Sequence, residues 1–179
     1  MLPHYIGPMT NFRKAEISDI PSLHLLVNSA YRGDSSKKGW TTEADLLDGQ
    51  RTDPEGLREM ISGPDSQIEL ATDDEKILGC VYIKREEDQL YFGMLTVNPE
   101  LQTQGLGKKL LLRVEEIALG LGFKTIRMTV IGQREELIAF YERRGYRRTG
   151  KTEPFPDHDP RFGLPKTSLV FHEFVKKID

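Results

Sequence analysis

The chain has 179 residues, of which 37% are hydrophobic and 30% charged, a composition typical of an ordinary globular protein rather than of a disordered or membrane-embedded one. A formal net charge of −3 and an isoelectric point near 5.9 argue against a general nucleic-acid binder. The single cysteine excludes an internal disulfide framework and fits a cytoplasmic setting. We therefore expect one domain over residues 10–179 behind a loose lead-in at 1–9, with no apolar run long enough to span a membrane.

The first third of the chain predicts a strand, two helices and a long polar loop. Residues 11–17 suit a short strand, and apolar side chains within 20–30 recur at helical spacing. Residues 32–53 are polar and glycine-rich and too long for a plain connector, so we expect a lid or binding loop with one short helix. Pro54 suits the first turn of a second short helix that ends near residue 61.

The rest of the chain predicts a meander, a crossover and a terminal strand pair. Strand patterns separated by turn signals lie at 67–72, 77–85, 90–97, 125–130, from 146 to 149, and 168–175. Helical patterns lie at 106–121 and 134–144, and a proline-rich loop covers 153–166. The expected fold class is α+β, with a mixed, mostly antiparallel central sheet of about seven strands, one parallel pair and flanking helices.

The stretch LQTQGLGKK, residues 101–109, places Gly105 and Gly107 where a strand gives way to a helix. The first N–H groups of a helix lack internal partners and attract an anion. No Walker sequence GxxxxGK[ST] occurs, and the dinucleotide pattern G-x-G-x-x-G fails at Leu110. From these residues alone, an anion site and a plain two-glycine turn remain equally open.

Two longer motifs decide between them. The string LxVxPxxQxxGxG is formed by Leu95, Val97, Pro99, Gln102, Gly105 and Gly107. It resembles the acetyl-CoA signature of the GNAT N-acetyltransferase superfamily, and LIAFYERRGYRRTG, from residue 137, is similar to the LYxxxGF landmark of that family. The resemblance implies a sheet with a splayed strand pair, an acyltransferase activity, and acetyl-CoA as co-substrate without a metal.

The resemblance also implies where the coenzyme lies. Its pyrophosphate would meet the backbone amides of Gln102, Thr103, Gln104, Gly105, Leu106, Gly107 and Lys108. Its pantetheine arm would pair with main-chain groups of Leu95, Thr96 and Val97, one of which would polarise the thioester carbonyl. Arg134 stands where the family often has an asparagine, and it would contact a coenzyme phosphate instead.

Tyr141 would act as the general acid for the departing thiolate, because a phenol stays protonated at neutral pH and can donate. The alternative is an aromatic side chain that only packs on the buried face of its helix. For the general base, Glu69 is one candidate, and Glu43 and Asp45 in the polar loop are others. Carboxylates of this kind are more often simply solvated, and this alternative stands for all three.

The acceptor site is less defined. Trp40 could stack on an acceptor or anchor its loop, and Tyr91 could line the site or belong to the core. Acidic residues slightly outnumber cations in the two long loops, which favours a cationic amine. They are Asp34, Glu43, Asp45, Asp48, Asp157 and Asp159.

The leading hypothesis is transfer of an acetyl group to a primary amine, on a small molecule or a peptide, by direct attack in a ternary complex. The alternatives are a non-catalytic acyl-CoA-binding regulatory module and a partner-binding domain without coenzyme. We expect no nucleic acid or membrane partner, and a homodimer is left open.

Overall fold

The computed structural model describes residues 9–39, 42–156 and 159–179, and for residues 102–104 and 162 only the backbone. Most of the expected lead-in, together with Trp40, lies outside the described residues. The strands are β1 (Asn11–Lys14), β2 (Leu47–Asp48), β3 (Ser66–Asp73), β4 (Lys76–Arg85), β5 (Leu90–Val97), β6 (Thr125–Ile131), β7 (Arg147–Pro154), β8 (Leu164–Pro165) and β9 (Val170–Lys177). The helices are α1 (Ile20–Tyr31), α2 (Gly33–Ser36), α3 (Pro54–Ser62), α4 (Leu106–Gly120) and α5 (Glu135–Glu142), with 3-10 turns η1 (Ile17–Asp19), η2 (Pro99–Gln104) and η3 (Pro160–Phe162).

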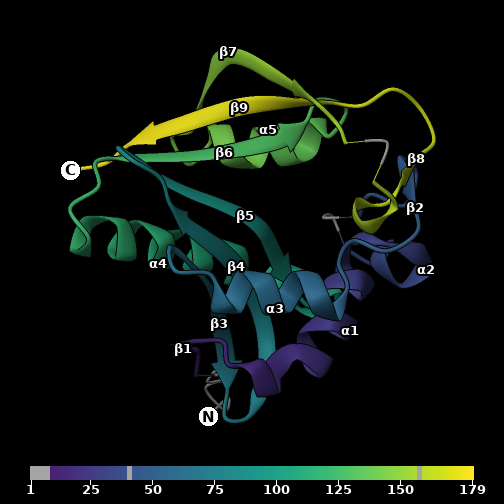
Figure 1. Ribbon diagram of the computed structural model, residues 1–179, viewed down its shortest axis with the longest axis horizontal. Helices are drawn as coiled ribbons and strands as arrows, with labels where there is room; N and C mark the ends of the chain where they lie inside the picture. Colours follow the sequence, from purple (N-terminus) through teal and green to yellow (C-terminus); the bar gives the residue numbers. More distant parts are fainter. Residues whose placement is uncertain (1–8, 40–41, 157–158) are drawn as a thin grey trace, which may run out of the picture.

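The central sheet has seven strands in the order β1-β3-β4-β5-β6-β9-β7 (Figure 1). Every neighbouring pair is antiparallel except β5 and β6, which are parallel. Helix α4 makes the crossover between those two strands. The expected α+β fold class, a mostly antiparallel sheet of seven strands, is confirmed. A separate two-stranded sheet of β2 and β8 was not predicted, and it ties the two long loops together.

Strands β5 and β6 part soon after they meet. They pair only at Leu90 with Ile126 and at Tyr91 with Arg127, although β5 continues to Val97. On its other side β5 carries a bulge, because Met94 and Leu95 together oppose one residue of β4. Met94 has φ of 52°, a left-handed conformation that is strained for this side chain. Figure 1 shows the two strands diverging toward the end of the sheet that faces β2 and β8.

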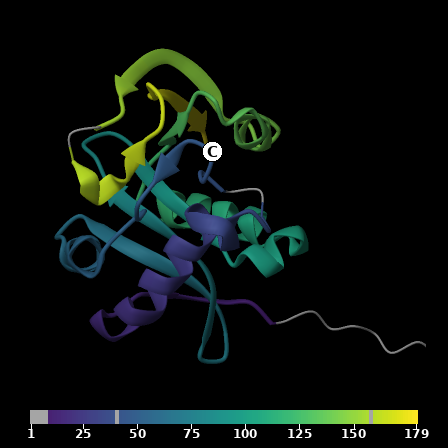
Figure 2. The same cartoon turned by 90° about the vertical axis from the view of Figure 1, so that its right-hand side faces the viewer.

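The helices cover both faces of the sheet. Helices α1 and α3 enclose one core with β3, β4 and β5, whereas α4 and α5 pack on a larger core on the opposite face. Figure 2 shows α3 and α4 on opposite sides of the strands. The longest described helix, α4, has 15 residues, and no described helix is long and apolar enough to cross a membrane.

The structure differs from the sequence-based boundaries at both edges of the sheet. The first strand ends at Lys14, because residues 17–19 form a 3-10 turn in which Asp19 accepts from the Glu16 backbone. The strand predicted over residues 146–149 extends further along the chain and ends at Pro154. Strand β7 is the outermost strand, where a proline without an N–H donor is tolerated.

Tyr146 lies at the centre of the larger core, where it places a polar hydroxyl group. Its side chain is fully buried, and its hydroxyl has no hydrogen-bond partner. Burial raises the pKa of this phenol, and also that of Tyr31, which reaches about 12. A pKa raised by folding stabilises the protein below pH 10, and this contribution is lost as the pH rises toward the folded-state pKa.

We predict that Tyr146→Phe raises the free energy of unfolding at pH 7 by about 1 kcal/mol, because it removes an unsatisfied buried hydroxyl. The variant should also lose less stability than the wild type between pH 9 and 11. Chemical denaturation at several pH values measures both effects. Tyr31→Phe is the matched control: its hydroxyl donates to the Leu95 carbonyl, so the variant should be destabilised by about 1 kcal/mol. A destabilised Tyr146→Phe would contradict this account.

Candidate active site

A cavity of about 110 Å³ opens where β5 and β6 part. Five of the residues singled out from the sequence line it: Glu43, Tyr91, Leu95, Arg134 and Tyr141. They come from the polar loop, strand β5 and helix α5, so the fold gathers residues that are far apart in the chain. The divergence of the strands therefore creates a site rather than a packed core.

Tyr141 forms one wall of this cavity. Its side chain is 4% exposed, and its ring packs against Phe92, Phe140 and Tyr146 with centroid separations of 6.0, 5.3 and 5.7 Å. Its hydroxyl makes no hydrogen bond to another described residue. Burial raises the pKa of the phenol well above 10, so it stays protonated at neutral pH. Tyr141 thus packs as an aromatic anchor and also lines the cavity with a proton donor.

Tyr31, which the sequence did not single out, fixes the opposite wall. Its hydroxyl donates to the main-chain carbonyl of Leu95, directly at the bulge of β5. Thr96 adds a side-chain hydrogen bond of 2.9 Å to the Met94 carbonyl. These two bonds hold the bulged backbone in place. Because the partners Tyr31 and Leu95 are 64 residues apart, no local pattern could reveal them.

Glu43 and Arg134 belong to a buried ionic cluster. One carboxylate oxygen of Glu43 accepts from Arg32, and the other accepts from Arg134 at 3.0 Å. All three side chains are at most 8% exposed. The Arg134 guanidinium also lies over the Tyr31 ring, 5.8 Å from its centroid. Both oxygens of Glu43 are thus engaged, and Arg134 contacts protein groups where the sequence suggested a coenzyme phosphate.

Glu69 does not join this site. It lies on the face of β3 that α4 covers, where it is 1% exposed and accepts from Arg113 at 2.8 Å. Gln67 donates to its second oxygen at 3.1 Å. Glu69 lines none of the cavities around the parted strands. Glu69 thus links β3 to α4 through Arg113, and its role as a general base stays a prediction.

The glycine-containing stretch forms a turn that leads into α4. Residues Pro99–Gln104 make a 3-10 turn, and Gly105 then takes φ of 76° as the N-cap of α4. No atom lies within 4 Å of the position that a Cβ on Gly105 would occupy. The first turn of α4 contains no acidic residue, and Lys108 and Lys109 are exposed there. The side chains of Gln102, Thr103 and Gln104 lie outside the described part of the structure.

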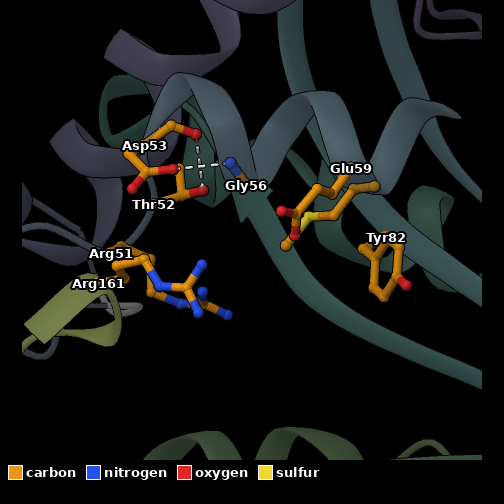
Figure 3. A pocket seen from close by; sticks show the side chains of 8 residues that line it. Arg51, Thr52, Asp53, Gly56, Glu59, Tyr82 and Arg161 are labelled. Carbon is orange, nitrogen blue, oxygen red and sulfur yellow. Dashed lines mark hydrogen bonds between the residues drawn. The ribbon is translucent and has the colours of Figure 1, made fainter. Parts of the chain in front are cut away.

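Two larger cavities adjoin the first on the side of α1 and α3. One, of about 440 Å³, shares Tyr91, Arg51 and Glu43 with the 110 Å³ cavity. The other, of about 240 Å³, lies against the start of α3 and is shown in Figure 3. Tyr91 lines both of the cavities nearest the parted strands, so it belongs to the site rather than to a closed core.

The single cysteine, Cys80, is a buried core residue. It is fully buried, and burial raises the pKa of its thiol to about 12. Among the described residues, no group of three or more His, Cys, Asp or Glu side chains is placed to hold a metal ion.

Comparison with known families gives the class of protein that this fold and site define. The family model described as "Acetyltransferase (GNAT) domain" matches residues 36–156. That range covers more than half of the chain, and the chain belongs to the GNAT acetyltransferase family. It is therefore an acyltransferase. A search of curated proteins found no match.

Solved structures share the fold at low sequence identity. The ribosomal-protein-S18-alanine N-acetyltransferase from Escherichia coli has a TM-score of 0.70 and 16% identity, over 96% of this chain and 95% of that one. The PaiA N-acetyltransferase from Thermoplasma acidophilum, in complex with coenzyme A, has a TM-score of 0.67 and 19% identity, over 95% and 99%. The IAA acetyltransferase from Bacillus cereus has a TM-score of 0.66 and 15% identity, over 95% and 100%.

The ionic cluster generates a prediction about stability. Glu43→Ala should lower the free energy of unfolding by about 3 to 5 kcal/mol, because it removes the buried acid that two buried guanidinium groups share. Denaturant titration measures the change. Asp45→Ala, an exposed loop acid two residues away, should stay within about 0.5 kcal/mol of the wild type. Equal effects of the two substitutions would show that the cluster does not stabilise the fold.

Proposed function

We propose that the protein transfers an acetyl group from acetyl-CoA to a primary amine by direct attack in a ternary complex. The observation that carries the proposal is the 110 Å³ cavity between β5 and β6. It is lined both by the protonated phenol of Tyr141 and by the bulged main chain at Leu95. A proton donor can protonate the departing thiolate, and main-chain N–H groups can polarise the thioester carbonyl.

The start of α4 is suited to the coenzyme's pyrophosphate. A helix N-terminus carries about half a positive charge and offers unpaired N–H groups. Open space beside Gly105 allows a ligand to approach the backbone closely, and a φ of 76° suits glycine. The exposed lysines of the first turn are disfavoured by the helix dipole, and an anionic ligand there offsets that cost. From this point the parted strand β5 leads back toward Leu95.

The chemistry follows from the residues around the cavity. The neutral amine attacks the acetyl carbonyl, so that a C–N bond forms and the C–S bond breaks. Tyr141 gives its proton to the departing thiolate and is reprotonated from solvent. The proton lost by the amine leaves through water in the adjoining 440 Å³ cavity, because both oxygens of Glu43 are held by arginines. The products are an amide and coenzyme A.

We predict that Tyr141→Phe lowers kcat by about 100-fold or more, because general acid catalysis contributes on that order. Coenzyme binding should persist, as measured by the rise in melting temperature on adding coenzyme A. In the wild type, kcat should not fall with rising pH up to about 10, because the pKa of Tyr141 is raised. Tyr146→Phe, an adjacent buried phenol that does not line the cavity, is the control and should keep its activity. An unchanged kcat for Tyr141→Phe would remove this residue from the mechanism.

A second prediction tests the coenzyme site. Acetyl-CoA at 100 times its Kd should stabilise the wild type by about 2.7 kcal/mol, seen as a higher melting temperature. Gly105→Ala should weaken that response, because the added Cβ enters the open space through which the ligand approaches the backbone. Its strain at φ of 76° costs roughly 1 to 2 kcal/mol in the free and bound forms alike. Gly120→Ala is the matched control at the other end of α4, where a Cβ also meets no atom within 4 Å and φ is not positive. If acetyl-CoA does not stabilise the wild type, the proposed function is wrong.

A further inference from the structure

We propose that the acceptor amine also carries a carboxylate, which Arg51 binds, so that the substrate is a small amino acid rather than a simple amine. This inference rests on the proposed function and names the substrate class of the same site. Counting acids in the loops favoured a cationic acceptor. The side chains that surround the cavities favour an anionic group instead.

Arg51 occupies a central position. It lines the 110, 240 and 440 Å³ cavities, and it is the residue at which all three meet. No described acid lies within ion-pair distance of its guanidinium, although Arg32 and Arg134 nearby are paired with Glu43. Its guanidinium carbon lies 5.4 Å from the centroid of the Tyr31 ring. Arg51 therefore presents an unbalanced positive charge and a planar set of donors to the cavities.

The backbone that carries Arg51 is held rigidly. Asn28 of α1 accepts from the backbone N–H of Arg51 at 2.6 Å and of Thr52 at 3.3 Å, and donates to the Thr52 carbonyl at 3.0 Å. The next residue, Asp53, caps α3 by accepting from Gly56 at 2.7 Å. A binding group on a backbone tied to two helices is pre-organised, which reduces the entropy lost on binding.

The acidic side chains near Arg51 do not neutralise its positive charge. The charge of Glu43 is shared by two arginines, Asp53 is used as a helix cap, and Asp159 accepts from Arg161 at 2.9 Å. Arg51 and Arg161 both line the 240 Å³ cavity, and Figure 3 shows them at one end of it with Glu59 on the other side. Glu59 is exposed, lies on α3, and makes no ion pair with Arg51. Arg161 is neutralised by Asp159, so the charge that favours an anion in the space next to the strands is that of Arg51.

The position of Arg51 also limits the size of the acceptor. Tyr31 contacts Arg51 with its ring and the Leu95 carbonyl with its hydroxyl. The anion site is thus separated from the place of acyl transfer by one tyrosine side chain. An amine and a carboxylate on the same or adjacent carbon atoms can span this separation. The carboxylate is unchanged in the reaction, which forms one C–N bond and releases coenzyme A.

The test uses sets of acceptors with the same carbon skeleton: an amino acid, its carboxamide, and the amine that lacks the carboxylate. Coenzyme A release gives kcat/KM for each member of a set. The amino acid should exceed the other two by at least about 10-fold, since a hydrogen-bonded charge pair contributes that much. Arg51→Gln should lower kcat/KM for the amino acid by about 10- to 100-fold and leave the simple amine within about twofold.

Two control variants sharpen the comparison. Arg51→Lys keeps the charge but not the planar pair of donors, so it should lie between the wild type and Arg51→Gln. Arg58→Gln, an exposed arginine of α3 that lines none of the three cavities, should behave as the wild type. Equal loss on the amino acid and the amine in Arg51→Gln would mean that Arg51 only maintains the structure, which overturns the inference.

Binding separates this inference from the proposed function. Isothermal titration of the amino acid and its carboxamide, each with coenzyme A present, reports on the anion site without turnover. If the wild type prefers the amino acid and Arg51→Gln abolishes that preference, the anion site is supported. This holds even if no acceptor is acetylated, and in that case only the proposed function is wrong. A wild type that neither binds nor acetylates amino acids in preference to their neutral analogues overturns the inference.

Discussion

The separation of β5 from β6 is the constraint on which the rest of the molecule depends. Strand β6 is held along its whole length by β9, from Thr125 to Ile131, and β5 is held on its far side by β4. Each strand therefore finds hydrogen-bond partners on its outer neighbour. Strands β5 and β6 pair with each other only at two positions, near the beginning of each strand. Parallel partners that diverge leave main-chain edges that must find other partners. The bulge at Met94 and Leu95 turns part of that edge into the wall of a cavity.

The polar groups around the gap show how the opening is kept from collapsing. A gap lined only by aliphatic side chains would close by burying them. An ionic cluster resists closure, because a rearrangement that separates its ion pairs would leave buried charges uncompensated. Glu43 links Arg32 at the end of α1 to Arg134 at the start of α5, which connects the helices on the two faces of the sheet. The cluster costs desolvation, and its main value is to fix where the polar loop sits.

Local patterns were sufficient to predict most elements but not how their side chains meet. The bounds of β5 and the start of α4 agree with the sequence, because alternation and the Gly105 turn are encoded within a few residues. Of the five candidate residues that line the cavity, Leu95 and Tyr141 belong to the two motifs, whereas Glu43, Tyr91 and Arg134 join them only through the packing of the fold. Alternation did not reveal which face of β3 Glu69 occupies, so its partner Arg113 was not foreseen. Tyr31 and Arg51 carry no motif, and they become recognisable only when α1 is packed on β5.

The two halves of the site come from different parts of the chain. Strand β5, the start of α4 and Tyr141 lie within residues 90–142, whereas Asn28, Tyr31 and Arg51 lie within the first third. Asn28, Tyr31 and Arg32 even precede residue 36, where the family match begins. Substitutions in the early segment can thus reshape what enters the gap while the later segment keeps its geometry. Chimeras that exchange residues 9–62 between members of this fold offer a direct route to new selectivity.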